Sequence, residues 1–457
     1  MQGNTSRVEH DEAGPVSRFS VLRAFKLGSF HVGSSLSDLI TSAVWNRVMI
    51  TDLGVAAWPV ALLSAARYLL APLSLWAGHR SDTRPLFGTR RLGYIGVGRL
   101  LMLISLPALP ISILAITEDR SSLAGWALAL LSFVVYGTGT LISGAPYLGL
   151  VHDSAPYARR GQAVAIVHFM LVVSFAFVPV LYARLMPRYD PDLFVGVVVY
   201  GMVGAALFWV FSLWGEEHRS TSHPPAEKEP VPLRQAVERI WGDPSARRYA
   251  AFLFASAFFA FMQDAMLEPF GGDVFGLAVG ETTRFNAYWG VGVLVGMAGA
   301  LVVTRRTRPD QQVRTTSLGL IFLALPLMGL GTASFFRAQA AVIPLLIAFG
   351  LGFGIFTVGG TSLLMAMSKE EMAGSYLALW SVIQLTARGA GIAVGGVVRD
   401  IVLAVSGEIA AAYGALFLLE GIGLVMSVVM LLRVDVAGFA QRRTRASTTE
   451  LLAGASG

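Results

Sequence analysis

Acidic and basic side chains inside long apolar runs are the residues of this sequence best placed to do chemistry. Each such charge costs about 2.5–3.5 kcal/mol at the centre of a bilayer unless it is paired or hydrated. Asp264 and Glu268 are four residues apart and share one face of a predicted helix. They are suited to bind a proton or a cation, or to brace a helix bundle by pairing with Arg67 or Arg388.

The first apolar run is unusually polar. Only a face that looks onto a cavity or another helix tolerates such side chains in lipid. It contains His31, and a later run contains His168 near the same end. Neutral imidazole is a good axial ligand for the magnesium of a chlorin, while hydrogen-bonded packing is the alternative for each histidine. The set that we place in a pigment or substrate cavity is His31, Ser35, Asp38, Asn46 and His168.

No arrangement typical of an enzyme accompanies these residues. The chain has no cysteine, which excludes disulfides, thiolate chemistry and Cys-based metal sites. Glycine-rich stretches such as 350–354 follow no predicted strand and precede no Lys-Ser/Thr pair, so they are helix-packing sites and not nucleotide loops. We therefore expect no catalytic site, no bound metal ion and no firmly bound cofactor.

Composition places these charges in a membrane protein. Hydrophobic residues make up 54% of the 457 residues and charged residues only 14%, whereas about 25% is usual in soluble domains. The charges cluster between apolar runs that are long enough to cross about 30 Å of hydrocarbon as helices. The net charge of +6 therefore bears on membrane orientation and does not indicate a nucleic-acid partner.

The apolar runs predict an all-α membrane protein of about twelve transmembrane helices in two pseudo-symmetric six-helix bundles. The N-terminal bundle is expected over 25–214 and the C-terminal bundle over 247–432. Cytoplasmic tails are expected at 1–24 and 433–457, with a hydrated linker at 215–246. The predicted helices lie near 25–50, 54–78, 92–116, 123–150, 161–184, 192–214, 247–272, 284–304, 315–336, 340–367, 374–400 and 408–432.

The distribution of basic residues predicts the orientation of the bundle. Most of the 35 Lys and Arg fall in the two tails and in alternate loops. The positive-inside rule then puts both termini in the cytoplasm, which requires an even number of spans. The two halves also resemble each other. Ser37 and Asp38 in the first span occupy positions equivalent to those of Gln263 and Asp264 in the seventh.

The loop after the second predicted span, 78–91, resembles the cytoplasmic signature of the major facilitator superfamily. It has Asp82 after a Gly and three residues, then a Gly followed by the paired basics Arg90 and Arg91. The spacing after Asp82 is longer than in the commonest version and closer to that of the glycoside–cation symporters. An ordinary basic loop is the alternative. The gate and interface residues that we expect are Asp82, Arg90, Arg91, Arg67, Asp264, Glu268 and Arg388.

Several longer strings resemble the PucC/LhaA family, also called the bacteriochlorophyll delivery family. The resemblance covers nearly the whole chain, with the tails and the linker least covered. One departure is Phe270, where the family string leads us to expect Tyr. The strings are 27–38 (LGSFHVGSSLSD), 44–49 (VWNRVM), 66–72 (ARYLLAP), 76–82 (WAGHRSD), 267–272 (LEPFGG), 274–276 (VFG) and 280–283 (GETT).

This resemblance implies a major facilitator fold and a role in assembling light-harvesting antenna complexes in phototrophic bacteria. It implies that bacteriochlorophyll is the cargo and that it is delivered to antenna polypeptides, with chlorophyll synthase as a further partner. The implied location is the bacterial inner membrane, cytoplasmic or intracytoplasmic. Two alternatives stay open: an ion-coupled transporter of a small polar solute, and a scaffold that holds antenna subunits and moves nothing.

Overall fold

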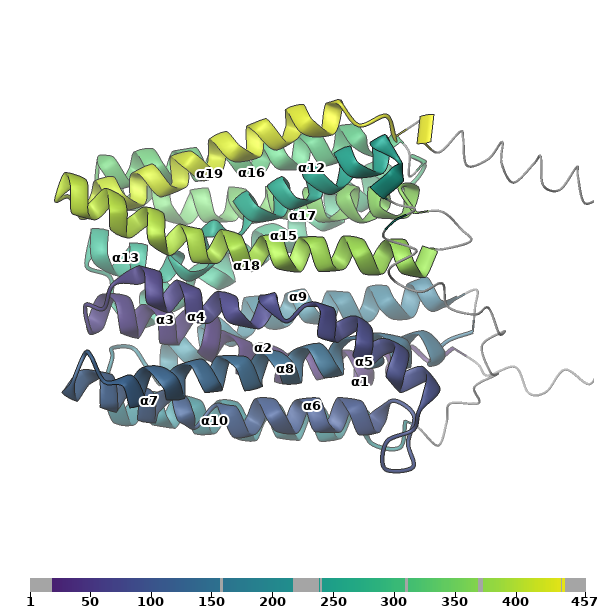
Figure 1. The fold of residues 1–457 in the computed structure, drawn as a ribbon, viewed down its shortest axis with the longest axis horizontal. Helices are drawn as coiled ribbons and strands as arrows, with labels where there is room; N and C mark the ends of the chain where they lie inside the picture. Colours follow the sequence, from purple (N-terminus) through teal and green to yellow (C-terminus); the bar gives the residue numbers. More distant parts are fainter. Residues whose placement is uncertain are drawn as a thin grey trace, which may run out of the picture.

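The computed structural model describes residues 19–156, 159–216, 238, 241–308, 311–368, 373–436 and 438–439. Most of both predicted tails and of the linker, and the side chain of Asp82, lie outside this part of the chain. The described residues are almost entirely helical and contain no β-strand beyond one isolated bridge between Leu86 and Thr89. Figure 1 shows the N-terminal helices in purple to blue packed below the C-terminal helices in green and yellow.

Within the described residues the helices form twelve passes along one common axis, as the hydropathy pattern predicts. The six N-terminal passes are α1 to η2 (Val21–Gly28, Phe30–Leu39, Ile40–Val44, Trp45–Arg47 and Val48–Asp52), α4 with α5 (Ala57–Leu69 and Pro72–Thr83), α6 with α7 (Leu92–Ser105 and Ala108–Glu118), α8 (Leu123–Asp153), α9 (Arg160–Leu185) and α10 (Pro191–Leu213).

The six C-terminal passes repeat this pattern. They are α12 with η5 and α13 (Pro244–Ala260, Met262–Ala265 and Leu267–Phe275), α14 with α15 (Val279–Thr283 and Phe285–Thr304), α16 (Val313–Phe335), η7 with α17 (Gln339–Ala341 and Val342–Ala366), α18 (Ala373–Ser406) and α19 (Ile409–Leu432).

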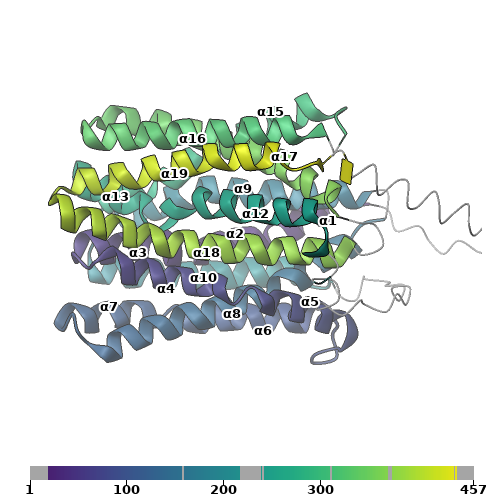
Figure 2. The same cartoon turned by 45° about the horizontal axis from the view of Figure 1, so that its top comes forward.

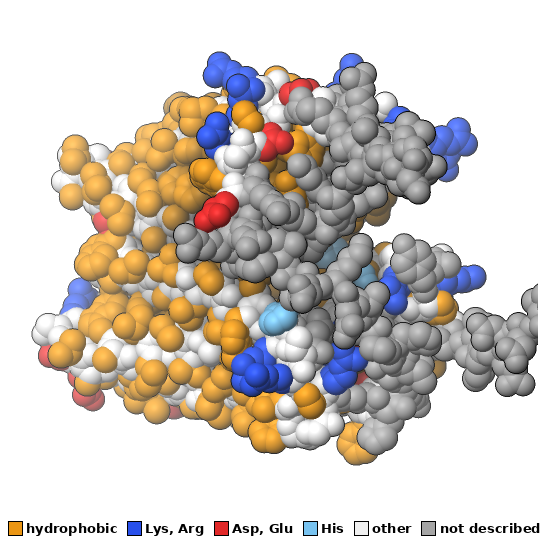
Figure 3. Space-filling model, turned by 45° about the vertical axis from the view of Figure 1, so that its right-hand side comes forward, with side chains coloured by type: hydrophobic (Ala, Val, Ile, Leu, Met, Phe, Trp, Pro, Cys, Tyr) orange, Lys and Arg blue, Asp and Glu red, His pale blue; other side chains and the backbone are white. Residues whose placement is uncertain are grey.

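Ten helices within the described residues are long and apolar enough to cross a membrane, and α12 to α13 is an eleventh when counted as one span bent by 47°. The first pass completes the twelve, although its polar residues and its breaks keep it from being one regular apolar helix. Figure 3 shows broad hydrophobic surfaces over the lengths of the helices, with blue Lys and Arg side chains gathered near the grey segments. The bundle thus has the surface of a membrane protein.

Both halves begin with a broken helix. In the first pass the hydroxyls of Thr41 and Ser42 donate to the carbonyl oxygen of Asp38 at 2.9 and 2.8 Å. Such local bonds compete with the helical ladder, and two π-helical segments, η1 and η2, follow. In the seventh pass a 3₁₀ turn, η5, precedes Pro269, which cannot donate a backbone hydrogen bond. Breaks of this kind in a span are tolerated where they line a cavity.

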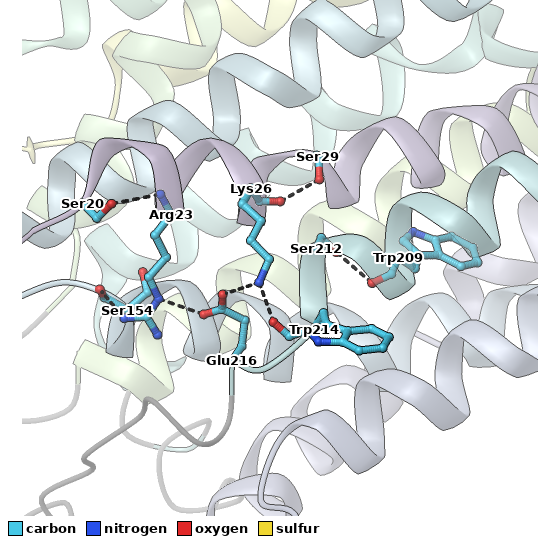
Figure 4. Close-up of polar contacts among 9 residues, drawn as sticks. All are labelled: Ser20, Arg23, Lys26, Ser29, Ser154, Trp209, Ser212, Trp214 and Glu216. Carbon is cyan, nitrogen blue, oxygen red and sulfur yellow. Dashed lines mark hydrogen bonds and ion pairs between the residues drawn. The ribbon is translucent and has the colours of Figure 1, made fainter.

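We call the end of the bundle that carries Phe19, Glu216 and Phe439 the tail face, and the opposite end the far face. At the tail face, buried Glu216 accepts hydrogen bonds from Arg23 and Lys26 of α1, each at 2.8 Å (Figure 4). Arg23 also donates to the carbonyl oxygen of Ser154 at 3.2 Å. These contacts tie the first pass to the ends of α8 and α10.

The two halves are joined by hydrogen bonds at the far face. Arg47 of the first half donates to the carbonyl oxygen of Leu277 at 3.0 Å, and Gly280 N–H donates to the carbonyl oxygen of Pro187 at 3.1 Å. The Trp58 N–H donates to Asp400 at 2.8 Å. The halves also pack along α4 against α18 and α9 against α15 (Figure 2). These bonds close the interface between the halves on the far side.

Candidate functional site

A cavity with charged side chains in a largely apolar wall lies between the two halves and is bordered by the breaks in the first and seventh passes. Its volume is about 380 Å³. Five ionisable side chains line it: Asp38, Arg67, Asp264, Glu268 and Arg388. The remaining wall is polar in part (Ser42, Tyr68, Thr140, Gln263 and Asn286) and aromatic in part (Phe175, Phe261, Trp289, Phe349 and Phe353).

Asp38 is the acid of the first pass. Its Oδ1 accepts a hydrogen bond from the hydroxyl of Tyr136, a fully buried residue of α8, at 2.6 Å. A buried carboxylate needs such donors, because burying a charge without partners is expensive. Tyr136 is a site residue that sequence reasoning missed.

Arg67, on α4, is the cavity cation without an acidic partner. Among the described residues no carboxylate lies within ion-pair distance of it, and its Nη1 donates only to the hydroxyl of Thr41 at 3.3 Å. Its Nε has no hydrogen-bond acceptor. Its guanidinium lies over the Tyr68 ring at 4.8 Å. Arg67 therefore retains hydrogen-bonding capacity at the cavity wall.

Asp264 and Arg388 form an ion pair within the C-terminal half. Arg388 donates to Asp264 Oδ2 from Nη2 at 2.6 Å and from Nε at 3.1 Å. The same guanidinium lies 4.2 Å from the Phe261 ring centre and 4.8 Å from that of Tyr68, which belongs to the other half. Of the two arginines that the sequence suggested as partners for Asp264, Arg388 is the one that pairs with it.

Glu268 does not pair with either arginine. Its Oε1 accepts a short hydrogen bond from Asn286 of α15, and its Oε2 has no partner among the described residues. The Gln263 Oε1 and the Trp289 Nε1 also lack hydrogen-bond partners there. The expected regular helical face shared by Asp264 and Glu268 is interrupted, since Asp264 lies in η5 and Glu268 begins α13. Both side chains nevertheless reach the cavity.

Only one of the five residues that the sequence placed in a single cavity lines the central cavity. Asp38 lines the central cavity, but His31, Ser35, Asn46 and His168 are not among its lining residues. Asn46 is buried and accepts a hydrogen bond from Ser64 at 2.8 Å, and Ser35 is fully buried. These two side chains therefore pack within the N-terminal half.

His31 lies in an aromatic and cationic cluster of the N-terminal half. Its ring meets the Tyr147 ring edge-on at a centroid distance of 5.4 Å. Phe30 stacks on Tyr147 at 3.8 Å, and the Arg99 guanidinium lies over Phe30 at 4.2 Å. His168 of α9 is close enough to His31 for their charges to interact. The described residues contain no group of three or more His, Cys, Asp or Glu that could hold a metal ion.

The predicted gate loop lies at the tail face. Arg91 forms an ion pair with Asp153 at the end of α8, so the loop after the second pass contacts the loop after the fourth. The turn between Leu86 and Thr89 places Phe87 and Gly88 at positive φ. Arg90 also interacts with its surroundings. This loop is separate from the central cavity, which none of its residues line.

Comparison with solved structures identifies the fold. A POT family peptide transporter has a TM-score of 0.67 at 13% identity, with 93% of this chain and 96% of that one covered. A D-xylose–proton symporter has a TM-score of 0.65 at 15% identity, covering 90% and 96%. At such low identity the likeness shows the fold alone, which is that of the major facilitator transporters.

The chain belongs to the PUCC protein family, which it matches over residues 44–439. It is therefore a bacterial membrane protein of a family linked to photosynthesis. It is 29% identical to the "Uncharacterized protein in puhA-bchM intergenic region" of Rhodobacter capsulatus, over 82% of this chain and 80% of that protein. It is 27% identical to the "Bacteriochlorophyll synthase 44.5 kDa chain" of Rhodobacter capsulatus (92% and 97%) and 28% to "Protein PucC" of Rhodovulum sulfidophilum (83% and 85%).

Proposed function

We propose that this protein is an assembly factor for light-harvesting antenna complexes, which binds bacteriochlorophyll in the membrane and hands it to antenna polypeptides. The observation that carries the proposal is the family match over residues 44–439. The name of the 44.5 kDa relative supports pigment as the cargo and chlorophyll synthase as a partner. The role is not enzymatic, since delivery changes none of the pigment's bonds.

The size of the central cavity bears on how the pigment is held. Cavities of about 300–1,000 Å³ suit drug-sized ligands, and this one, at about 380 Å³, is near the lower limit. A bacteriochlorophyll with its long isoprenoid tail exceeds that size. The proposal therefore has the pigment held laterally, with part of it in contact with lipid. His168 on α9 is less deeply buried than His31 and is therefore the more accessible candidate magnesium ligand.

Membrane orientation is part of the proposal. The tail face carries many of the arginines outside the membrane, whereas the far face carries few, such as Arg120, Arg188 and Arg337. By the positive-inside rule the tail face is cytoplasmic. The far-face hydrogen bonds of Arg47, Trp58 and Gly280 then close the periplasmic side.

An absorption spectrum tests pigment binding. The protein is purified in mild detergent from a phototrophic host that lacks antenna polypeptides, so pigment in the sample cannot come from them. We expect a near-infrared bacteriochlorophyll band, reduced in His168→Leu and unchanged in His79→Leu, an exposed tail-face control. A colourless protein, when membranes of the same strain contain free pigment, would contradict the proposal and favour a scaffold that moves nothing.

A second function is supported by the five ionisable residues around the cavity. Charges are retained inside a membrane where they serve ion or substrate pathways, and Asp38, Asp264 and Glu268 line the space between the two halves. This arrangement suits an ion-coupled transporter of a small polar solute. Proton-dependent uptake into vesicles that is lost in Asp264→Asn would establish it.

A further inference from the structure

Side chains that line the central cavity carry buried hydrogen-bonding atoms of both kinds that the protein itself leaves unsatisfied. Two acceptors, Gln263 Oε1 and Glu268 Oε2, have no donor among the described residues. Two donors, Arg67 Nε and Trp289 Nε1, have no acceptor there. Unsatisfied buried polar atoms cost about 1–3 kcal/mol each. Four of them on side chains around one cavity indicate a ligand with both donors and acceptors.

The cavity also has a cation and an acid that lack an ion-pair partner among the described residues. Asp264 and Arg388 neutralise each other, and Asp38 is satisfied in part by Tyr136. Arg67 is left with only a hydroxyl, and Glu268 with only an amide. Arg67 comes from α4 of the first half and Glu268 from α13 of the second. The unpaired cation and the unpaired acid therefore lie on opposite halves.

Part of the cavity wall contributed by the C-terminal half is aromatic. Trp289 and Phe353 meet edge-to-face at 5.2 Å, and Phe353 meets Phe261 at 5.6 Å. Aromatic faces attract ammonium groups, and an ammonium would supply donors to Glu268 and Gln263. A carboxylate matches the guanidinium of Arg67, which binds planar anions in a fork.

We propose that the central cavity binds a small zwitterion, with its carboxylate at Arg67 and its ammonium at Glu268 and Gln263. The inference deepens the second candidate function and rests on it, and it is independent of pigment delivery. A cavity of about 380 Å³ equals the liquid volume of about a dozen waters, which suits an amino-acid-like molecule. Binding from both halves also gives the ligand a means to bias their relative position.

The test is a titration series on the purified full chain in lipid nanodiscs. The probes are unbranched ω-amino acids of three to eight carbons, each compared with the alkylamine and the alkanoate of the same length. Calorimetry on the native protein gives the three affinities at every length. We expect one length at which the zwitterion binds at least tenfold more tightly than either single-charge analogue. The absence of such a length would overturn the proposal without affecting the pigment result.

Two substitutions assign the two ends of the ligand. In Arg67→Gln the zwitterion should bind no better than the alkylamine, and in Glu268→Gln no better than the alkanoate. The matched controls, Arg188→Gln and Glu281→Gln at the far face, should retain the native preference. A zwitterion preference that survives both cavity substitutions would overturn the assignment. Melting curves without ligand identify any variant that fails to fold. If one fails, the chain-length series on the native protein tests the proposal without it.

Discussion

Among the charges inside the membrane, Asp264 and Arg388 are a pair held by several contacts. Asp264 accepts two hydrogen bonds from Arg388, and that guanidinium is further covered by Phe261 and Tyr68. The exposed fractions of the two side chains are 23% and 32%. The pair is therefore only partly shielded from the cavity. Removing one partner should lower the free energy of unfolding by less than it would in a fully buried pair.

We predict that Asp264→Asn and Arg388→Met each lower the free energy of unfolding by about 1.5–3 kcal/mol, the usual range for hydrogen bonds to charged groups. The double variant should lose less than the sum of the single losses, because the second change no longer strands a charge. Denaturant unfolding in detergent measures all three, with Arg188→Met as the exposed control. Strictly additive losses would show that the two side chains do not act as a pair.

The sequence identified the cavity acids but only part of their surroundings. Asp38, Asp264 and Glu268 stand out because charges inside apolar runs are rare. The partners Tyr136 and Asn286 do not stand out, since an uncharged polar side chain does not reveal its partner and Tyr136 is 98 positions from Asp38. His31 was equally ambiguous: an imidazole that packs on Tyr147 and one that faces a cavity give the same sequence pattern.

At the scale of elements, α1 connects three parts of the N-terminal half. Glu216, which follows α10, is fully buried between Arg23 and Lys26 of α1, and Lys26 also donates to the carbonyl oxygen of Trp214 at 2.5 Å. One carboxylate therefore forms ion pairs with two cations at the tail face (Figure 4). Without it, the two cations would repel each other beside an emptied site.

We predict that Glu216→Ala loosens α1 and lowers the free energy of unfolding by about 1–3 kcal/mol, because two charge-assisted hydrogen bonds are lost. The sharper measurement is trypsin cleavage after Arg23 and Lys26, which should become several-fold faster in the variant. Glu281→Ala at the far face is the control. Equal cleavage rates in the native protein and Glu216→Ala would mean that other contacts hold α1.

Hydropathy predicts the passes well but not their breaks. The twelve predicted runs match twelve helical passes, because length and apolarity decide whether a segment can cross lipid. The π-helical segments Ile40–Val44 and Val48–Asp52 have no such signal. Their only trace in the sequence is the density of Ser, Thr and Asn in the first span, which indicates a cavity without locating the break.

At the scale of the whole molecule, the two halves meet closely toward the far face. A Cβ on Gly290 of α15 would lie 3.4 Å from the Cβ of Ala176 on α9, in the other half. Disulfides have a Cβ–Cβ distance of about 3.5–4.5 Å, so a slight outward shift of either helix brings this pair into range. The chain has no cysteine of its own, so a pair introduced here can form no competing disulfide. This makes the closed far face directly testable.

We predict that Ala176→Cys combined with Gly290→Cys forms a disulfide under mild oxidant. Because the bond joins the halves, it should hold the far face closed and stop uptake of the preferred ω-amino acid into proteoliposomes, and reduction should restore uptake. Ala176→Cys with Gly299→Cys is the control, since nothing lies within 4 Å of a Cβ at Gly299. Uptake that continues in fully cross-linked protein would mean that solute passes without separation of the halves, and would contradict alternating access through this cavity.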